Sequence, residues 1–305
     1  MNIKKSMKSL ITGLLFIAFS INSFCQKLEP KVRTVEPDHV IKSNIMNRNY
    51  ELYISFPNNY SIKDTISYPV LYVLDGSSIF SWFTEQHKRL MSTGKLKDVI
   101  IVGVGSGLDF ISWGLNRNYD YTPSQDTISD REFEKEAAQS YNLDYNMIKG
   151  QMKSGGAPKF LQTLKSEIIP FIEKNYKTNF SRGISGLSLG GLFSAYCFIN
   201  SDGYFDKFGI NSPSLWWMKE ELLDKAVLQF TENKTWEIPP TNVYISVGGK
   251  EGLDMVPAMV KFSLHLEDAE YENINLKWHV FDNESHGSVL RPSLSRTLIE
   301  LYRKE

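Results

Sequence analysis

One short pattern constrains this chain more than any other: Gly186-Leu187-Ser188-Leu189-Gly190-Gly191. Apolar, strand-forming residues precede the serine, and a helical pattern follows it to about Asn200. Glycines on both sides of such a serine let a strand and a helix approach closely across a sharp turn that strains the serine backbone. A bare five-residue match occurs by chance in many chains, but the flanking strand and helix are the context that supports it. The pattern predicts a nucleophile elbow with Ser188 exposed at its tip.

Strand and helix patterns alternate along most of the chain. Apolar runs at 68–74, 99–105, 207–212, 242–247 and 275–281 are separated by segments with helical spacing, and residues 27–56 have the pattern of edge hairpin strands. This alternation predicts an α/β fold with a mostly parallel central sheet and helices on both faces. Between about 106 and 157 there is no strand pattern, only a polar helix around 130–141. We interpret that segment as an insertion, and long insertions are usually functional.

The N-terminus resembles an export signal. Lys4, Lys5 and Lys8 precede an apolar run over 10–21, and small or polar residues follow it up to Cys25. These features predict a signal peptide over 1–25, with cleavage after Cys25 and a secreted or periplasmic protein. The run is shorter than the ~20 residues that a membrane span needs, which argues against a permanent span. The bulky Phe24 argues against a lipid anchor on Cys25.

Charge and cysteine content narrow the function classes. The formal charge of −1 becomes −1 − 3 = −4 when the leader's three lysines leave, so nucleic acid is not an expected partner. Cys197 then remains without a disulfide partner and is expected to be a buried apolar residue. Because no linker divides residues 26–305, we expect one domain there. Its oligomeric state stays open.

A serine hydroxyl needs a base to take its proton, and five histidines are available. His286 is the one that falls in a strand-end loop, after the last predicted strand. In the α/β-hydrolase fold the nucleophile, the acid and the histidine follow one another in that order along the chain. The sequence therefore predicts an α/β-hydrolase fold with Ser188 as nucleophile and His286 as base.

The loop after the penultimate strand offers two carboxylates for the acid. Glu251 lies nearer the strand end and is preferred, whereas Asp254 also suits the start of the next helix. Asp282 and Glu284 are close to His286 in sequence and remain alternatives.

The oxyanion of a tetrahedral intermediate needs backbone N–H donors. Leu189 is expected to supply one of them. The second is expected from Ser77, with Gly76 as the alternative.

These motifs resemble the putative-esterase (esterase D-like) family of α/β-hydrolases, and within it the enterochelin esterase-like siderophore hydrolases. The stretches that carry the resemblance are 68–76, 116–123, 155–176, the elbow and 212–217, and together they span most of the chain from about residue 40. The resemblance implies that Arg117 borders the cleft and contacts an anionic or catecholate substrate, with an ion pair to Asp120 as the alternative. The adjacent Trp216 and Trp217 suggest a pocket wall, although core packing is expected for at least one of them.

Together these features predict a secreted serine carboxylic ester hydrolase that works through an acyl-enzyme and needs no metal or cofactor. The family resemblance favours a siderophore lactone as substrate. A feruloyl or acetyl esterase acting on polysaccharide is the alternative, so the expected partner is a small-molecule or oligosaccharide ester. A catalytically idle protein that keeps the fold and binds ligand is a third hypothesis.

Overall fold

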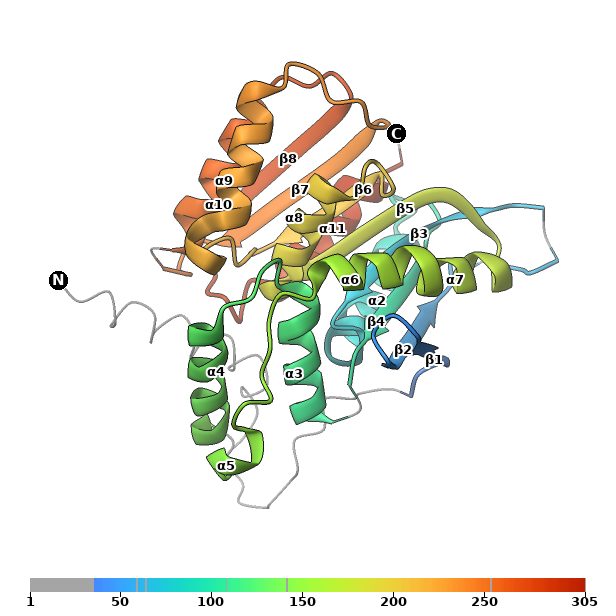
Figure 1. The fold of residues 1–305 in the computed structure, drawn as a ribbon. Helices are drawn as coiled ribbons and strands as arrows, with labels where there is room; N and C mark the ends of the chain where they lie inside the picture. The colour runs from blue at the N-terminus through green and yellow to red at the C-terminus, as the bar shows by residue number, and fades with distance from the viewer. Residues whose placement is uncertain are drawn as a thin grey trace.

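A single eight-stranded sheet forms the centre of the structure (Figure 1). The computed structural model describes residues 36–304, apart from Asn59, Asp64, Leu108, Tyr141 and Leu253. The strands lie in the order β1-β2-β4-β3-β5-β6-β7-β8. Their bounds are β1 His39–Ser43, β2 Arg48–Ser55, β3 Tyr68–Leu74, β4 Ile100–Gly105, β5 Thr178–Leu187, β6 Lys207–Asn211, β7 Thr241–Gly248 and β8 Ile274–Phe281.

Strand direction agrees with the prediction from the sequence. β1 and β2 form an antiparallel hairpin at one edge, and β2 also pairs antiparallel with β4. The strands from β4 through β3 to β8 are mutually parallel. The mostly parallel sheet with helices on both faces is the predicted α/β-hydrolase fold. The carboxyl ends of β3 and β5–β8 therefore lie along one edge, where ligands of such sheets bind.

Helices cover both faces of the sheet (Figure 1). On one face, the apolar side chains of α2 and α11 form one buried cluster with residues of the sheet. On the other face, those of α6, α8, α9 and α10 belong to a larger buried cluster. The helices are α2 Gly76–Ser92, α3 Phe110–Tyr121, α4 Thr127–Ser140, α5 Tyr145–Ile148, α6 Ala157–Thr163, α7 Ile169–Asn175, α8 Leu189–Asn200, α9 Trp217–Glu232, α10 Met255–Asp268 and α11 Leu290–Tyr302. A π-helical turn, Leu164–Ile168, joins α6 to α7.

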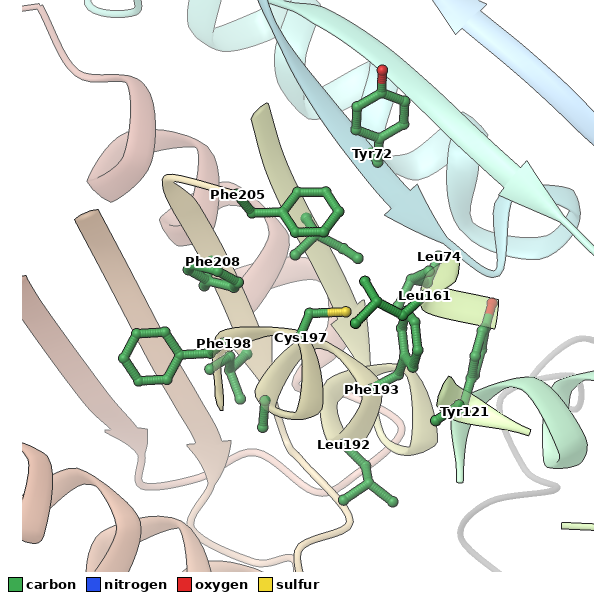
Figure 2. Close-up of a cluster of buried hydrophobic side chains, with 14 of the residues drawn as sticks. Tyr72, Leu74, Tyr121, Leu161, Leu192, Phe193, Cys197, Phe198, Phe205 and Phe208 are labelled. Carbon is green, nitrogen blue, oxygen red and sulfur yellow. The ribbon is translucent and has the colours of Figure 1, made fainter. Parts of the chain in front are cut away.

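Alternation along β3 shows how the sequence builds the two layers. Leu71 and Val73 face the cluster under α2 and α11, whereas Tyr72 and Leu74 face the larger cluster under α8. A strand with both faces covered must be apolar throughout, as β3 is. Figure 2 shows Cys197 of α8 among aromatic and aliphatic side chains of this larger cluster. Its thiol is free and fully buried, as predicted, and burial raises its pKa.

The segment 106–157 contains helices and no strand within its described residues, in agreement with the sequence. The predicted polar helix is α4, but α3 was not expected, because its sequence is rich in Asn, Tyr and Asp. A capping box between Asp109 and Ser112 starts α3. Figure 1 shows α3 and α4 in green, with α5 at the far end of α4 and the start of α6 next to α3.

The predicted signal peptide over 1–25 lies outside the described residues. Within 36–304, no helix combines the length and apolar character that crossing a membrane requires.

Candidate active site

The turn around Ser188 is the predicted strand–turn–helix. β5 ends at Leu187, α8 begins at Leu189, and Ser188 between them has φ 64° and ψ −120°. A Cβ at Gly186 would collide with the backbone of Gly190, and one at Gly191 would collide with the carbonyl of Asn211. Only glycine at these positions lets the strands and the helix approach so closely. The strained serine conformation thus follows from the pattern that predicted it.

The expectation that Ser188 stands exposed is wrong. Ser188 is only 1% exposed, because segments from neighbouring strand ends pack around the turn. The Ser188 N–H donates to the carbonyl of Asn211 at 3.1 Å. The Ser188 carbonyl accepts from the N–H of Leu192 at 2.9 Å and from that of Ser214 at 3.1 Å. The hydroxyl of Ser188 has no hydrogen-bond partner among the described residues.

Beneath the elbow lies a buried polar network centred on Asn211. Its side-chain amide donates to Ser185 Oγ at 3.2 Å, and its side-chain oxygen accepts from Ser246 and Thr297 at 2.9 and 3.0 Å. All four residues are fully buried, so each satisfied hydrogen bond restricts the arrangement of β5, β6, β7 and α11. Asn211 was not among the residues predicted to form the site, although a polar residue at the end of a buried apolar run was a visible signal.

A carboxylate–imidazole pair lies at the same edge of the sheet. His286 Nδ1 is 2.6 Å from Glu251 Oε2, and the Glu251 side chain is fully buried while that of His286 is 13% exposed. An ionised carboxylate can only accept, so Nδ1 carries the proton of this bond. His286 Nε2 has no partner among the described residues. The pair leaves Nε2 as the atom through which His286 can take a proton.

Two loops bring this pair together. In the loop after β7, the N–H of Gly249 donates to the carbonyl of Phe281 at 2.8 Å. The N–H of Lys250 donates to the carbonyl of Glu284 at 2.9 Å. These bonds align the loop that carries Glu251 with the loop that carries His286.

Of the candidate acids, Glu251 is the one whose contact with His286 is described. Asp254 occupies the N-cap position of α10, the alternative that its sequence position suggested. Asp282 is exposed, and Glu284 contributes its backbone to the contact between the loops.

The segment Asp75-Gly76-Ser77 follows β3 and starts α2 beside the elbow. Asp75 has φ 55°, and a Cβ at Gly190 would lie 3.4 Å from the Asp75 carboxylate. Ser77 and Leu189 both lie in the first turn of a helix, where N–H groups have no partner within the helix. Their position suits the predicted oxyanion donors, and that role remains a prediction.

Arg117 is buried in an ion pair that was not predicted from the sequence. Its Nε donates to Asp75 Oδ1 at 2.8 Å, and its Nη2 donates to the carbonyl of Leu187 at 3.2 Å. The guanidinium lies over the rings of Trp113 and Tyr121. Burial raises the pKa of the Asp75 carboxyl, and the positive charge of Arg117 partly offsets this effect.

The alternative partner suggested for Arg117 was Asp120, but Asp120 instead pairs with Arg48. Nothing in the sequence around Arg117 indicated the true partner, because Asp75 is distant in the chain. Whether Arg117 also contacts substrate remains a prediction.

The two adjacent tryptophans have different surroundings. Trp217 is 2% exposed, packs against Phe133 and donates from Nε1 to the carbonyl of Ser124 at 3.2 Å, so it joins α9 to the insertion. Trp216 is half-buried and keeps accessible surface. The expectation that at least one of them is packed in the core is confirmed for Trp217. Directly after the pair, the three residues at 218–220 all have left-handed backbone, with φ between 47° and 69°.

No group of three or more His, Cys, Asp or Glu side chains arranged to hold a metal occurs in the described part of the chain.

Comparison with known proteins identifies the family of this chain. The apo-salmochelin esterase of Escherichia coli O6:H1 is 27% identical over 260 residues, covering 83% of this chain and 75% of the relative. The ferri-bacillibactin esterase BesA of Bacillus subtilis is 27% identical over 267 residues, covering 85% and 86%. A crystal structure of the BES protein from Bacillus cereus superposes with a TM-score of 0.71 at 27% identity, covering 93% of this chain and 99% of that one. The family model described as "Putative esterase" matches residues 43–262, and the chain therefore belongs to the putative esterase family.

Proposed function

We propose that this esterase is a serine hydrolase that cleaves carboxylic esters of the siderophore class through an acyl-enzyme. The observation that carries the proposal is the pairing of His286 Nδ1 with the buried Glu251, which leaves Nε2 unpartnered. The Ser188 hydroxyl, also unpartnered, lies at the carboxyl end of a parallel strand in the same sheet edge. A nucleophile, a base and an orienting acid in this chain order are the parts that acyl transfer needs.

The reaction follows from those parts. Ser188 Oγ attacks the ester carbonyl carbon while His286 Nε2 takes the hydroxyl proton. The bond to the leaving alcohol then breaks, and His286 returns the proton to the alcohol oxygen. Water attacks the acyl-serine in the same way, which releases the carboxylic acid and restores the serine hydroxyl. Glu251 holds the imidazole and stabilises its charged form.

The negative oxygen that forms during attack needs donors fixed before the reaction begins. We assign this role to the backbone N–H groups of Leu189 and Ser77. Both belong to the first turns of helices, and helix N-termini favour negative charge.

The substrate class rests on two relatives. Both are named as esterases of siderophores, salmochelin and ferri-bacillibactin, and each matches more than four fifths of this chain. The half-buried Trp113 and Trp216 offer aromatic surface near the elbow that suits catecholate rings.

The nucleophile is tested with Ser188→Ala. The variant should hydrolyse p-nitrophenyl acetate at least about 10⁴-fold more slowly than wild type and should lose labelling by a fluorophosphonate. Ser194→Ala is the matched control, because Ser194 on α8 is also a buried serine whose hydroxyl has no partner among the described residues. Retained turnover in Ser188→Ala would exclude Ser188 as nucleophile. A wild type without labelling but with tight ligand binding would point to the idle binding protein.

The substrate class is tested by measuring kcat/KM on a catecholate trilactone and on a feruloylated oligosaccharide. We expect the trilactone to be preferred. A preference for the oligosaccharide would move the protein to the carbohydrate esterases. Export is tested separately, by mass spectrometry of the mature N-terminus.

A further inference from the structure

Ser212, directly after β6, has an unusual combination of backbone and side-chain contacts. It is fully buried, and its φ of 40° lies in the left-handed region. Its N–H donates to the carbonyl of Ser246 at 2.6 Å. Glycine would adopt this backbone with less strain, so the serine side chain must contribute something that glycine lacks.

That contribution is a hydrogen bond to the acid. Ser212 Oγ donates to Glu251 Oε1 at 2.6 Å, while Glu251 Oε2 faces His286. The N–H of Gly248 also donates to Oε1, at 2.6 Å. Gly248 is the last residue of β7, three positions before Glu251, whereas Ser212 directly follows the neighbouring strand β6. Ser212 is therefore the contact through which β6 fixes the orientation of this carboxylate.

The segment 211–214 also holds the nucleophile. The carbonyl of Asn211 accepts from Ser188 N, and the N–H of Ser214 donates to Ser188 O. The segment thus touches the backbone of Ser188 on two sides and the side chain of Glu251 on a third. A change in its position would move the nucleophile and the acid together.

We propose that Ser212 is a positioning residue that sets the rotation and charge distribution of the Glu251 carboxylate, and through it the orientation of the His286 imidazole. The proposal rests on the function proposed above and extends it to a residue outside the triad. A donor on Oε1 holds Oε2 in line with Nδ1, and without it the carboxylate can rotate away while still accepting from Gly248. Ser212 touches neither substrate nor reacting atoms.

The test begins with Ser212→Ala, which keeps the strained backbone, and Ser212→Gly, which relieves it. Both remove the hydroxyl and should lower kcat by about tenfold to a hundredfold with KM within about twofold of wild type. In a Glu251→Ala background, Ser212→Ala should cause no further loss, because the residue acts through Glu251. An equal loss in both backgrounds would overturn the proposal, and so would a loss confined to Ser212→Ala.

A second measurement does not depend on turnover. The proton between His286 Nδ1 and Glu251 should give a far-downfield NMR resonance, assigned by its absence in His286→Gln. Ser212→Ala should shift or broaden it, whereas Ser194→Ala should not. An unchanged resonance in Ser212→Ala would overturn the positioning role, whether or not the wild-type protein is active. A wild-type protein that hydrolyses no ester and takes no serine label would instead contradict the proposed function.

Discussion

Two buried acid–base pairs flank the elbow, and they differ in what their bases can do. On the α2 side, Asp75 pairs with Arg117 at 2.8 Å, and on the β7–β8 side Glu251 pairs with His286 at 2.6 Å. A guanidinium does not release its proton in proteins, whereas an imidazole does so near neutral pH. Similar local arrangements therefore suit different tasks: the first pair holds structure and cannot move a proton, whereas the second can.

The remaining nitrogen atoms of the two bases support the same distinction. The second bond of Arg117 holds the carbonyl of Leu187, one residue before Ser188. The second ring nitrogen of His286 has no partner among the described residues. Burial of an acid beside a base does not by itself identify a catalytic pair, and the availability of the base's other atoms is more informative.

The largest expected effect is on the His286 side. His286→Ala should lower kcat/KM on p-nitrophenyl acetate by about 10⁴-fold or more, equivalent to about 5 kcal/mol of transition-state stabilisation, and should leave the melting temperature nearly unchanged. Steady-state kinetics measures kcat/KM, and a thermal melt measures the melting temperature. His279→Ala, at an exposed position on β8, is the control and should keep full activity. A His286→Ala variant that keeps its activity would remove the distinction between the pairs.

Breaking the other pair should act on stability. Arg117→Met leaves the Asp75 carboxylate buried without its cation, so the free energy of unfolding should fall by about 3–5 kcal/mol. Urea denaturation measures this loss. Lys261→Met, which removes solvent-exposed pairs with Glu220 and Asp224, is the control and should cost less than about 1 kcal/mol. An Arg117→Met variant of normal stability with a raised KM for anionic esters would instead support the substrate contact implied by the family resemblance.

His87 is a buried base without an acid partner, and it can be compared with the two acid–base pairs. His87 on α2 is 1% exposed, neither ring nitrogen has a partner among the described residues, and burial lowers its pKa to about 4. Its pKa in the unfolded chain is about 6.5, so the unfolded state binds the proton more readily as the pH falls. Stability should therefore decrease between about pH 6.5 and pH 4, by up to about 3 kcal/mol.

His87→Leu should reduce that decrease, whereas His279→Leu should not. The measurement is the free energy of unfolding at pH 8 and at pH 4.5 for each variant. An unchanged pH dependence in His87→Leu would mean that other groups cause the loss.

Local patterns made part of this molecule predictable from its sequence. The elbow, the positions of the parallel strands along the chain and the loop position of His286 follow from spacing over a few residues, and the structure contains each of them. The contact between Glu251 and His286 also agrees with the preferred acid, because the loops after neighbouring parallel strands must meet at one edge.

Contacts between distant segments were not predictable in the same way. Asp75 and Arg117 meet because α3 packs beside the elbow, and α3 itself forms despite a sequence that indicates a loop. Ser212 and Asn211 acquire their contacts only when β5, β6 and β7 lie side by side. The burial of Ser188 likewise depends on neighbouring strand ends rather than on its own turn.

The backbone bonds of Ser188 also constrain when its reactive geometry can form during folding. Its N–H and its carbonyl are held by Asn211 and Ser214, which follow it in the chain after an entire helix. Forming parallel strand contacts across such a connection is slow compared with forming a helix. The strained turn therefore cannot persist in a chain whose β6 has not yet docked. Reaction of Ser188 with an active-serine probe would then report completed folding, and a nascent or partly folded chain would carry no competent nucleophile.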